Sequence, residues 1–302
     1  MIKVHQLSKV FKETRVVDAL DLEIQKGEIF GLLGPNAAGK TTTIRMLCQL
    51  LKPTNGEVTI AGINLHEKSD RLKHSIAYVA QYFGLYDELT VLENLKFYAS
   101  LYKDQNEKTL LTLLEKYQIL NFKDAKAGSL SGGYKRRLSM CCALSHDPEV
   151  IFLDEPTAGI DPVTRKALWD IFYDLAEEGK TLFVTTHYME EAQRCNRIAF
   201  LSKGKKVIEG TPKEVQNSLN EFNIYKNTQK FAHKLLRELK KNENIHFINQ
   251  FGDELRFVVK KALSKEALAE LLTPYIEKKV HLELAEPNLE DVFIALTQEE
   301  QK

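Results

Sequence analysis

The chain has 302 residues, which is more than one ordinary domain holds, so we expect two domains. Hydrophobic residues make up 43% and charged residues 28%, which excludes a disordered protein and allows a sizeable core. The 42 Lys and Arg residues balance 42 Asp and Glu residues, which gives no electrostatic reason to expect a nucleic-acid partner. No signal peptide opens the sequence and no apolar run approaches the ~18 residues that span a bilayer, so we expect membrane work only through a partner chain.

The N-terminal region predicts strands followed by a phosphate-binding loop. Residues 2–33 are rich in β-branched residues and are interrupted by turn signals such as residues 12–14. Ile29–Leu33 predicts a buried strand, and apolar residues at helical spacing over residues 41–51 predict a helix. Between them, residues 34–41 fit the pattern G-x-x-x-x-G-K-[ST]. A chance glycine-rich turn is the alternative, but the strand before the loop and the helix after it favour a phosphate site.

The predicted loop supplies the chemistry that a nucleotide phosphate requires. Because the loop lies at a helix N-terminus, its backbone N–H groups and the helix dipole favour an anion. Lys40 adds a point charge for the β- and γ-phosphates, and the Thr41 hydroxyl is placed to ligate Mg²⁺. The predicted nucleotide site consists of Gly34, Pro35, Asn36, Ala37, Ala38, Gly39, Lys40, Thr41 and Thr42.

The middle of the chain predicts an α/β fold. Helical periodicity dominates residues 91–146. Two buried strands are expected at Val150–Asp154 and Thr181–Thr186, and an amphipathic helix is expected between them over residues 163–178. This alternation of strand, helix and strand is typical of a parallel sheet.

A second, smaller domain is expected at the C-terminal end. The pattern changes near residue 210, and we place the boundary so that the domains cover residues 1–218 and 219–302. The βαββαβ order of the second block predicts a ferredoxin-like α+β domain without chemistry of its own, and Asn288 is suited to cap a last helix. The expected strands are residues 223–227, 245–250, 254–260 and 279–284, and the expected helices are residues 231–241 and 265–276.

Further polar motifs of the first domain suit the same nucleotide chemistry. The Ser-Gly-Gly segment at residues 131–133 opens a helix, so its free N–H groups suit a second phosphate contact. Asp154 ends a buried strand and can hold Mg²⁺ through water, while Glu155 can orient or deprotonate an attacking water. His187 closes another strand, at the place from which it would reach the γ-phosphate. A lone His at a strand end is usually a surface residue. A functional role is favoured here only because the other motifs occur in the same domain.

With these motifs in order, residues 1–217 resemble the ATP-binding cassette (ABC) family of ATPases. The resemblance implies a P-loop NTPase domain with a RecA-like parallel sheet, an antiparallel β-subdomain and a helical subdomain. It also implies the activity, which is the hydrolysis of ATP with Mg²⁺ as cofactor. The alternative is a soluble ABC-type ATPase in translation or DNA repair, which the single cassette and the lack of coiled-coil heptads or paired C-x-x-C motifs disfavour.

The resemblance assigns roles to individual residues. The catalytic residues are Glu155, His187 and Lys40, and the Mg²⁺ ligands are Thr41, Gln81 and Asp154. Besides the loop, the family positions are Phe11, which stacks on adenine, Gln81 of the Q-loop, Ser131, Gly132 and Gly133 of the signature motif, and Asp161 of the D-loop.

The resemblance also implies partners. In this family the signature motif of one subunit caps ATP held by another, which implies a head-to-tail dimer, and an identical second subunit is favoured. Residues 30–47, 81–95 and 286–297 are similar to ATPase subunits of type 2 ABC exporters, which move drugs, lipids, polysaccharides or ions through a separate membrane permease. The expected location is therefore cytoplasmic, peripheral on the inner face of the cell membrane. The substrate, the direction of transport and the identity of the second subunit stay open.

In such exporters a groove near the Q-loop receives a short helix of the permease. Residues 85–127 are expected to frame this groove. Four apolar or aromatic residues are candidates for lining it, although a role in the helix core is favoured for each one alone. They are Phe83, Leu85, Tyr86 and Phe97.

The sequence departs from the common family pattern at two positions. Ala37 stands where Gly is frequent, and a Cβ there costs ~1 to 2 kcal/mol if the backbone has positive φ. Tyr134 replaces the usual Gln after the signature glycines, with an expected effect on the ribose side or on packing. The basic residues 135–137 follow, and a solvated helix face is favoured for them over a membrane or dimer contact.

Overall fold

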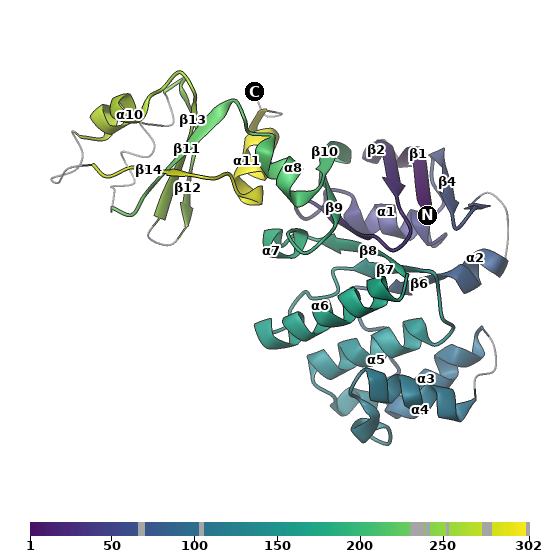
Figure 1. Ribbon diagram of the computed structural model, residues 1–302. Coiled ribbons are helices and arrows are strands. Elements are labelled where there is room, and N and C mark those ends of the chain that lie inside the picture. The colour runs from purple at the N-terminus through teal and green to yellow at the C-terminus, as the bar shows by residue number, and fades with distance from the viewer. Residues whose placement is uncertain are drawn as a thin grey trace. The chain divides into compact units, whose positions relative to one another are not determined.

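The computed structural model describes residues 1–65, 70–102, 106–229, 239, 242–251, 254–273 and 280–299. The chain forms two compact units, Met1–Glu209 and Gly210–Lys302 (Figure 1). The units therefore divide after Glu209, whereas the sequence predicted a boundary after residue 218. The reason is that helix α8 (Pro212–Asn217) contacts helix α11 (Leu289–Glu299), so these residues belong to the second unit.

The first unit contains an antiparallel sheet of four strands. Its order is β2 (Thr14–Ile24), β1 (Ile2–Phe11), β4 (Asn55–Ile60) and β5 (Ile63–Asn64). Strands β1 and β2 form a hairpin whose register closes with Phe11 opposite Thr14. This sheet is the antiparallel subdomain that the family resemblance implied.

A six-stranded sheet carries the motif residues at its edge. Its order is β10 (Lys205–Gly210), β9 (Arg197–Ser202), β3 (Ile29–Leu33), β8 (Thr181–Thr186), β7 (Val150–Asp154) and β6 (Ile76–Val79). Strand β3 is parallel to β8 and β9, and β7 is parallel to β6 and β8. Leu33 pairs with Thr186, and Asp154 pairs with Thr185, so the carboxyl ends of β3, β7 and β8 meet at one edge.

Helix α1 (Lys40–Leu47) lies between the two sheets (Figure 1). Its residues Ile44, Met46 and Leu47 belong to one core cluster with side chains of both sheets, because two apolar faces close over the helix. The helix ends earlier than residue 51. Gln49 adopts a left-handed conformation (φ 57°), which stops the helical hydrogen bonding.

Helices cover the other face of the six-stranded sheet (Figure 1). Helix α3 contacts both α4 and α5, so these three helices form the helical subdomain. The helices of the first unit that follow α1 are α2 (Asp70–Ser75), α3 (Val91–Ser100), α4 (Glu107–Lys116), α5 (Gly132–Leu144), α6 (Pro162–Glu177) and α7 (Met189–Ala192), with 3₁₀ turns at Leu120–Phe122 and Ala127–Ser129.

The second unit contains a four-stranded antiparallel sheet. Its order is β12 (Ile245–Phe251), β13 (Glu254–Lys260), β11 (Phe222–Asn227) and β14 (Glu283–Ala285), which is the ferredoxin-like order. The last strand covers only residues 283–285, because pairing with β11 begins at Glu283. The helix expected over residues 231–241 lies outside the described residues apart from residue 239.

Helices cover both faces of this sheet. Alternate residues of β13 point to opposite faces, so Phe257 packs in one core with Leu268 and Leu272 of α10 (Lys265–Leu272). Arg256 faces the other way and bonds Asp291 of α11. The Asn288 side chain accepts from the Asp291 N–H, which confirms the predicted cap.

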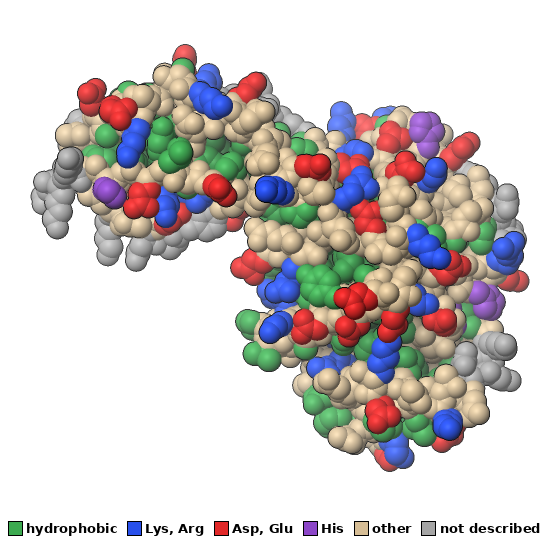
Figure 2. All heavy atoms as spheres, in the orientation of Figure 1, with side chains coloured by type: hydrophobic (Ala, Val, Ile, Leu, Met, Phe, Trp, Pro, Cys, Tyr) green, Lys and Arg blue, Asp and Glu red, His purple; other side chains and the backbone are tan. Residues whose placement is uncertain are grey.

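Two properties limit the kinds of partner, namely the charge of the surface and the length and apolar character of the helices. Figure 2 shows acidic and basic side chains interspersed over the face drawn, in keeping with the balanced charge. None of the described helices combines the length and the apolar character that a membrane crossing requires.

Candidate functional site

The phosphate-binding loop joins β3 to α1 with a backbone that requires glycine at two points. A Cβ on Gly34 would lie 2.3 Å from the Leu201 carbonyl oxygen. Gly39 caps the helix at φ 107°, and a Cβ on it would lie 2.7 Å from the Val16 carbonyl oxygen. Ala37 also adopts a left-handed conformation, at φ 65°, although it carries a Cβ. The condition attached to Ala37 in the sequence analysis is therefore met, and the loop contains strained backbone.

Lys40 is folded into the loop that it follows. Its side chain is 4% exposed, and Nζ donates to the carbonyl oxygens of Gly34 and Pro35 at 2.8 and 3.1 Å. Nζ also lies 3.3 Å from Glu155 Oε1. The cation therefore stands inside the loop, between its carbonyl groups and a carboxylate at the end of β7.

Asp154 is buried at the edge of the sheet and is held by hydroxyl groups. Thr185 and Thr41 donate to its Oδ1 at 2.7 and 3.2 Å, and Tyr78 donates to Oδ2 at 3.3 Å. Burial, and after it the Asp154 carboxylate, raises the pKa of Tyr78 to about 12. Thr41 and Asp154 thus lie together, as a shared metal requires. Tyr78 was not among the predicted site residues. Its one signal in the sequence is a side chain with a hydroxyl group in an apolar strand, three residues before Gln81.

Glu155 is the point on which three side chains converge. Lys40 approaches its Oε1, while Gln81 Nε2 donates to its Oε2 at 3.3 Å. His187 Nδ1 lies 3.3 Å from the same Oε2 without hydrogen-bonding geometry. Glu155 itself has φ 45°, and its N–H donates to Thr185 Oγ1 at 3.0 Å. A left-handed residue at such a position stores strain, which is frequent at functional sites.

Phe11 lies at the exposed end of β1. Its side chain is 43% exposed, and Lys9 Nζ stands 4.9 Å from the ring centroid. An exposed ring at the end of a strand is suited to stacking, as the adenine contact requires. Lys9 was not among the predicted site residues. Its only signal is that it stands two residues before Phe11, and so on the same face of one strand.

The signature residues form the exposed N-terminus of α5. Ser131 caps this helix and, like Gly132, is exposed. A Cβ on Gly133 would lie 2.8 Å from Thr164 Cγ2 of α6, so glycine permits the close packing of the two helices. The ring centroids of Tyr134 and Phe122 lie 4.5 Å apart, so Tyr134 packs inside the helical subdomain.

Asp161 caps the neighbouring helix α6. Its Oδ1 accepts from the N–H groups of Val163 and Thr164, both at 3.0 Å. Hydrogen bonds from Thr164 hold the pKa of Asp161 below its usual value. The D-loop residue and the signature helix are therefore adjacent, since Thr164 contacts both.

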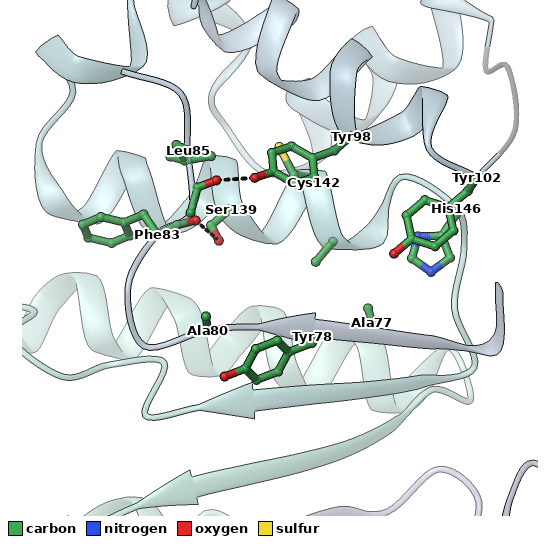
Figure 3. A pocket seen from close by; sticks show the side chains of 12 residues that line it. Ala77, Tyr78, Ala80, Phe83, Leu85, Tyr98, Tyr102, Ser139, Cys142 and His146 are labelled. Carbon is green, nitrogen blue, oxygen red and sulfur yellow. Dashed lines mark hydrogen bonds between the residues drawn. The ribbon is translucent and has the colours of Figure 1, made fainter. Parts of the chain in front are cut away.

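A cavity of about 220 Å³ lies between β6, the segment after it, α3 and α5 (Figure 3). Two of the four residues that the sequence proposed for the groove, Phe83 and Leu85, line this cavity. Tyr86 and Phe97 are not among its lining residues; they are 49% and 39% exposed and contact each other edge to face at 4.9 Å. The cavity and the exposed aromatic pair are thus two separate features of the first unit.

The basic segment after the signature residues is not uniform. Lys135 pairs with Asp87 at 3.0 Å, and Arg137 donates to Gln118 Oε1 at 3.0 Å. Arg136 is 1% exposed, so the prediction of a solvated helix face is wrong for this residue. The Arg136 side chain points inward from α5, toward the segment that follows β6.

Comparisons with known proteins agree with this architecture. A family model described as ABC transporter matches residues 17–158. The chain is 35% identical to the Nod factor export ATP-binding protein I of Cupriavidus metallidurans over 310 residues, which cover 100% of this chain and 99% of that protein. It is 40% identical to the probable multidrug ABC transporter ATP-binding protein YbhF of Escherichia coli over 220 residues, 72% of this chain. The chain spans only 38% of the length of that second relative.

Solved structures match about 70% of the chain. The dimeric structure of MJ0796, a bacterial ABC transporter cassette, is 30% identical, with a TM-score of 0.65 over 70% of this chain and 98% of that chain. A structure described as the ATP binding subunit of an ABC transporter is 27% identical, with a TM-score of 0.67 over 73% of this chain and 93% of that chain. The predicted fold is confirmed. The names of these relatives favour transport over translation or DNA repair.

Proposed function

Because the chain belongs to the family of ABC transporter ATP-binding proteins, we propose that it binds and hydrolyses ATP to drive export through a separate membrane permease. The observation that carries the proposal is the convergence of Lys40, Gln81 and His187 on Glu155 at the end of β7. These groups come from four separate segments, and the phosphate loop stands beside them. A carboxylate with this surrounding suits an attack by water on a phosphate held in the loop.

The chain's own groups have distinct tasks in this reaction. Lys40 leaves the loop carbonyl groups and binds the β- and γ-phosphate oxygens, because the ammonium gains more from phosphate charge than from neutral carbonyls. Glu155 orients the attacking water and accepts its proton. His187 and Gln81 hold the γ-phosphate and the water in line, so that catalysis is mainly positioning and charge neutralisation.

The residues present fit Mg²⁺. The Thr41 hydroxyl, the Asp154 carboxylate and the Gln81 amide supply the oxygen donors that this ion prefers. Thr41 Oγ1 already lies 3.2 Å from Asp154 Oδ1, as two groups around one ion require. When bound, Mg²⁺ neutralises charge on the β- and γ-phosphates.

Turnover of Glu155→Gln tests the reaction. This variant should bind ATP like the unmodified protein but hydrolyse it ~10² to 10⁴ times more slowly, which is the usual worth of a positioned base. Lys40→Ala should instead lose nucleotide affinity. Hydrolysis by Glu155→Gln at the unmodified rate would remove Glu155 from the role of base, while binding by Lys40→Ala at the unmodified affinity would place the nucleotide elsewhere.

We propose a second, identical subunit as partner. The signature end of α5 is exposed. The first N–H groups of a helix have no carbonyl partner within it, so a γ-phosphate held by another copy would suit this end. The solved MJ0796 cassette is itself dimeric. Light scattering should therefore show a shift from monomer toward dimer for Glu155→Gln with MgATP, no shift with ADP, and no shift after Ser131→Arg. A dimer that is equally populated with ADP would assign the subunit contact to another surface.

A membrane permease is the other proposed partner, and the cavity beside Phe83 is its proposed contact. The location that follows is cytoplasmic, at the inner face of the cell membrane. Affinity purification of the tagged chain from detergent extract should recover an integral membrane protein, and Phe83→Glu should reduce its recovery. Equal recovery with Phe83→Glu would place the contact elsewhere.

A further inference from the structure

The segment that follows β6 is held by side chains of the helical subdomain. Ser139 of α5 donates to the Phe83 carbonyl oxygen at 3.1 Å, and Tyr98 of α3 donates to the Gly84 carbonyl oxygen (Figure 3). Arg136 of α5 donates from Nη1 to the Ala80 carbonyl oxygen at 2.7 Å and from Nη2 to that of Gln81 at 2.8 Å. The backbone that carries Gln81 is therefore fixed by α5.

Arg136 stands out because its charge has no acidic partner. It forms no ion pair with any residue that the structure describes, and its Nε has no hydrogen-bond partner among them. Its guanidinium lies 4.9 Å from the Phe83 ring centroid, and burial lowers its pKa to about 10. Burying a charge without a counter-ion is unfavourable, so stability alone does not account for an arginine here.

One guanidinium links two distant parts of the site. On one side, Gln81 reaches Glu155, which in turn contacts Lys40 of the phosphate loop. On the other side, Arg136 lies little more than one helical turn from Ser131, the exposed cap of α5. Because a helix moves as a rigid element, a displacement of the Gln81 backbone is carried to the Ser131 end.

We propose that Arg136 is a positioning residue that fixes Gln81 relative to the N-terminus of α5. The inference rests on the proposed ATPase function and goes beyond it by naming the group that connects the Glu155 site to the signature end. Arg136 acts through Gln81 and touches no reacting atom. Its neighbours Lys135 and Arg137 do not contact the Gln81 backbone. Lys135 pairs with Asp87, six residues farther along the segment, and Arg137 donates to Tyr117 and Gln118 after α4.

A double-mutant cycle on the full chain tests the proposal. Arg136→Met should lower kcat for ATP at least about tenfold, since a small misplacement of a catalytic group has effects of this size. Its affinity for ATP should stay within about twofold of the unmodified protein, because the phosphate loop is untouched. In a Gln81→Ala background the same substitution should have no further effect on kcat, because its route is already removed.

Matched variants separate positioning from general damage. Arg137→Met should leave kcat within about twofold, and Arg136→Lys should restore part of the loss because its ammonium still donates to a carbonyl. If Arg136→Met does not fold, the same cycle is run with Arg136→Lys. Multiplicative effects of the Arg136 and Gln81 substitutions, or an unchanged kcat, would overturn the proposal. An unmodified protein that does not hydrolyse ATP would instead refute the proposed function.

Discussion

The two units of the chain both bury charged side chains, and the contrast lies in how those charges are paired. In the first unit, Lys40, Glu155 and His187 meet at separations of 3.3 Å, and His187 Nδ1 has no hydrogen bond. In the second unit, Arg256 and Asp291 form hydrogen bonds at 2.7 to 3.2 Å. Loosely paired charges are ready for a ligand, whereas fully paired ones fasten a helix to a sheet.

We therefore propose that the second unit is an accessory domain that regulates or steadies the assembly and takes no part in the chemistry. Its buried ion pair is satisfied from several sides. Arg256 Nη2 also donates to the Glu286 carbonyl oxygen at 2.7 Å, and Asp291 Oδ2 also accepts from the Asn288 N–H at 3.0 Å. No polar side chain of this cluster is left for a ligand.

The largest effect is expected from breaking this pair. Asp291→Ala should destabilise the second unit by about 3–5 kcal/mol, because it leaves the buried Arg256 without its counter-ion. The double variant Arg256→Met/Asp291→Leu should be less destabilised. Urea unfolding followed by circular dichroism should show an early transition in Asp291→Ala, while fluorescence of Trp169, the single tryptophan of the chain, should not change. A Trp169 transition that moves with it would mean that the two units unfold together.

A smaller effect, on kcat, is expected from removing a hydrogen bond to Asp154, a buried carboxylate of the first unit. Tyr78→Phe removes one donor from Asp154, and a hydrogen bond of this kind is worth about 1 to 2 kcal/mol, so kcat should fall roughly 5- to 30-fold. Tyr102→Phe, in the same cavity, serves as the control with unchanged kcat. An equal loss in both variants would point to the cavity and not to Asp154.

The pH dependence of this defect follows from the raised pKa of Tyr78. The phenol is neutral below its ordinary pKa near 10, and its contribution is lost only as pH rises toward about 12. The ratio of kcat between Tyr78→Phe and the unmodified protein should therefore stay constant from about pH 6 to 9. A ratio that changes with pH in this range would show that another group carries the effect.

A small gain in folding stability is expected from substituting the strained loop residue Ala37. Ala37→Gly relieves a left-handed Cβ but adds freedom to the unfolded chain, so the net stabilisation should be below about 1 kcal/mol. Ala38→Gly, at a buried position without positive φ, should instead lower stability. Thermal unfolding of both variants checks the sign, and a loss in Ala37→Gly would mean that its conformation is not strained.

No effect on nucleotide affinity is expected from removing the second unit. A fragment that ends at Glu209 should fold and bind MgATP as the full chain does, because every predicted nucleotide residue lies before this point. Calorimetric titration of both proteins compares the affinities. A folded fragment that fails to bind MgATP would show that the second unit contributes to the site.

Local pattern determined the elements of the fold. Strands β7 and β8 have the predicted limits, because a continuous apolar run that ends at a polar residue is a local property of the chain. The Asn288 cap was equally predictable, since the side chain bonds an N–H only three residues away. The resemblance of the motifs to a known family supplied the candidate site, and the structure brings Lys40, Gln81 and His187 around Glu155.

Only the tertiary structure decided which side chains meet across long stretches of sequence. Tyr78 reaches Asp154 across 76 residues, and Arg136 reaches Ala80 across 56, so neither contact has a local signature. The same holds for the limit of the second unit, which depends on α8 meeting α11. In each case the physical reason is the same: periodicity says which face of an element is apolar, whereas the partner of a buried polar group depends on which elements the fold places beside it.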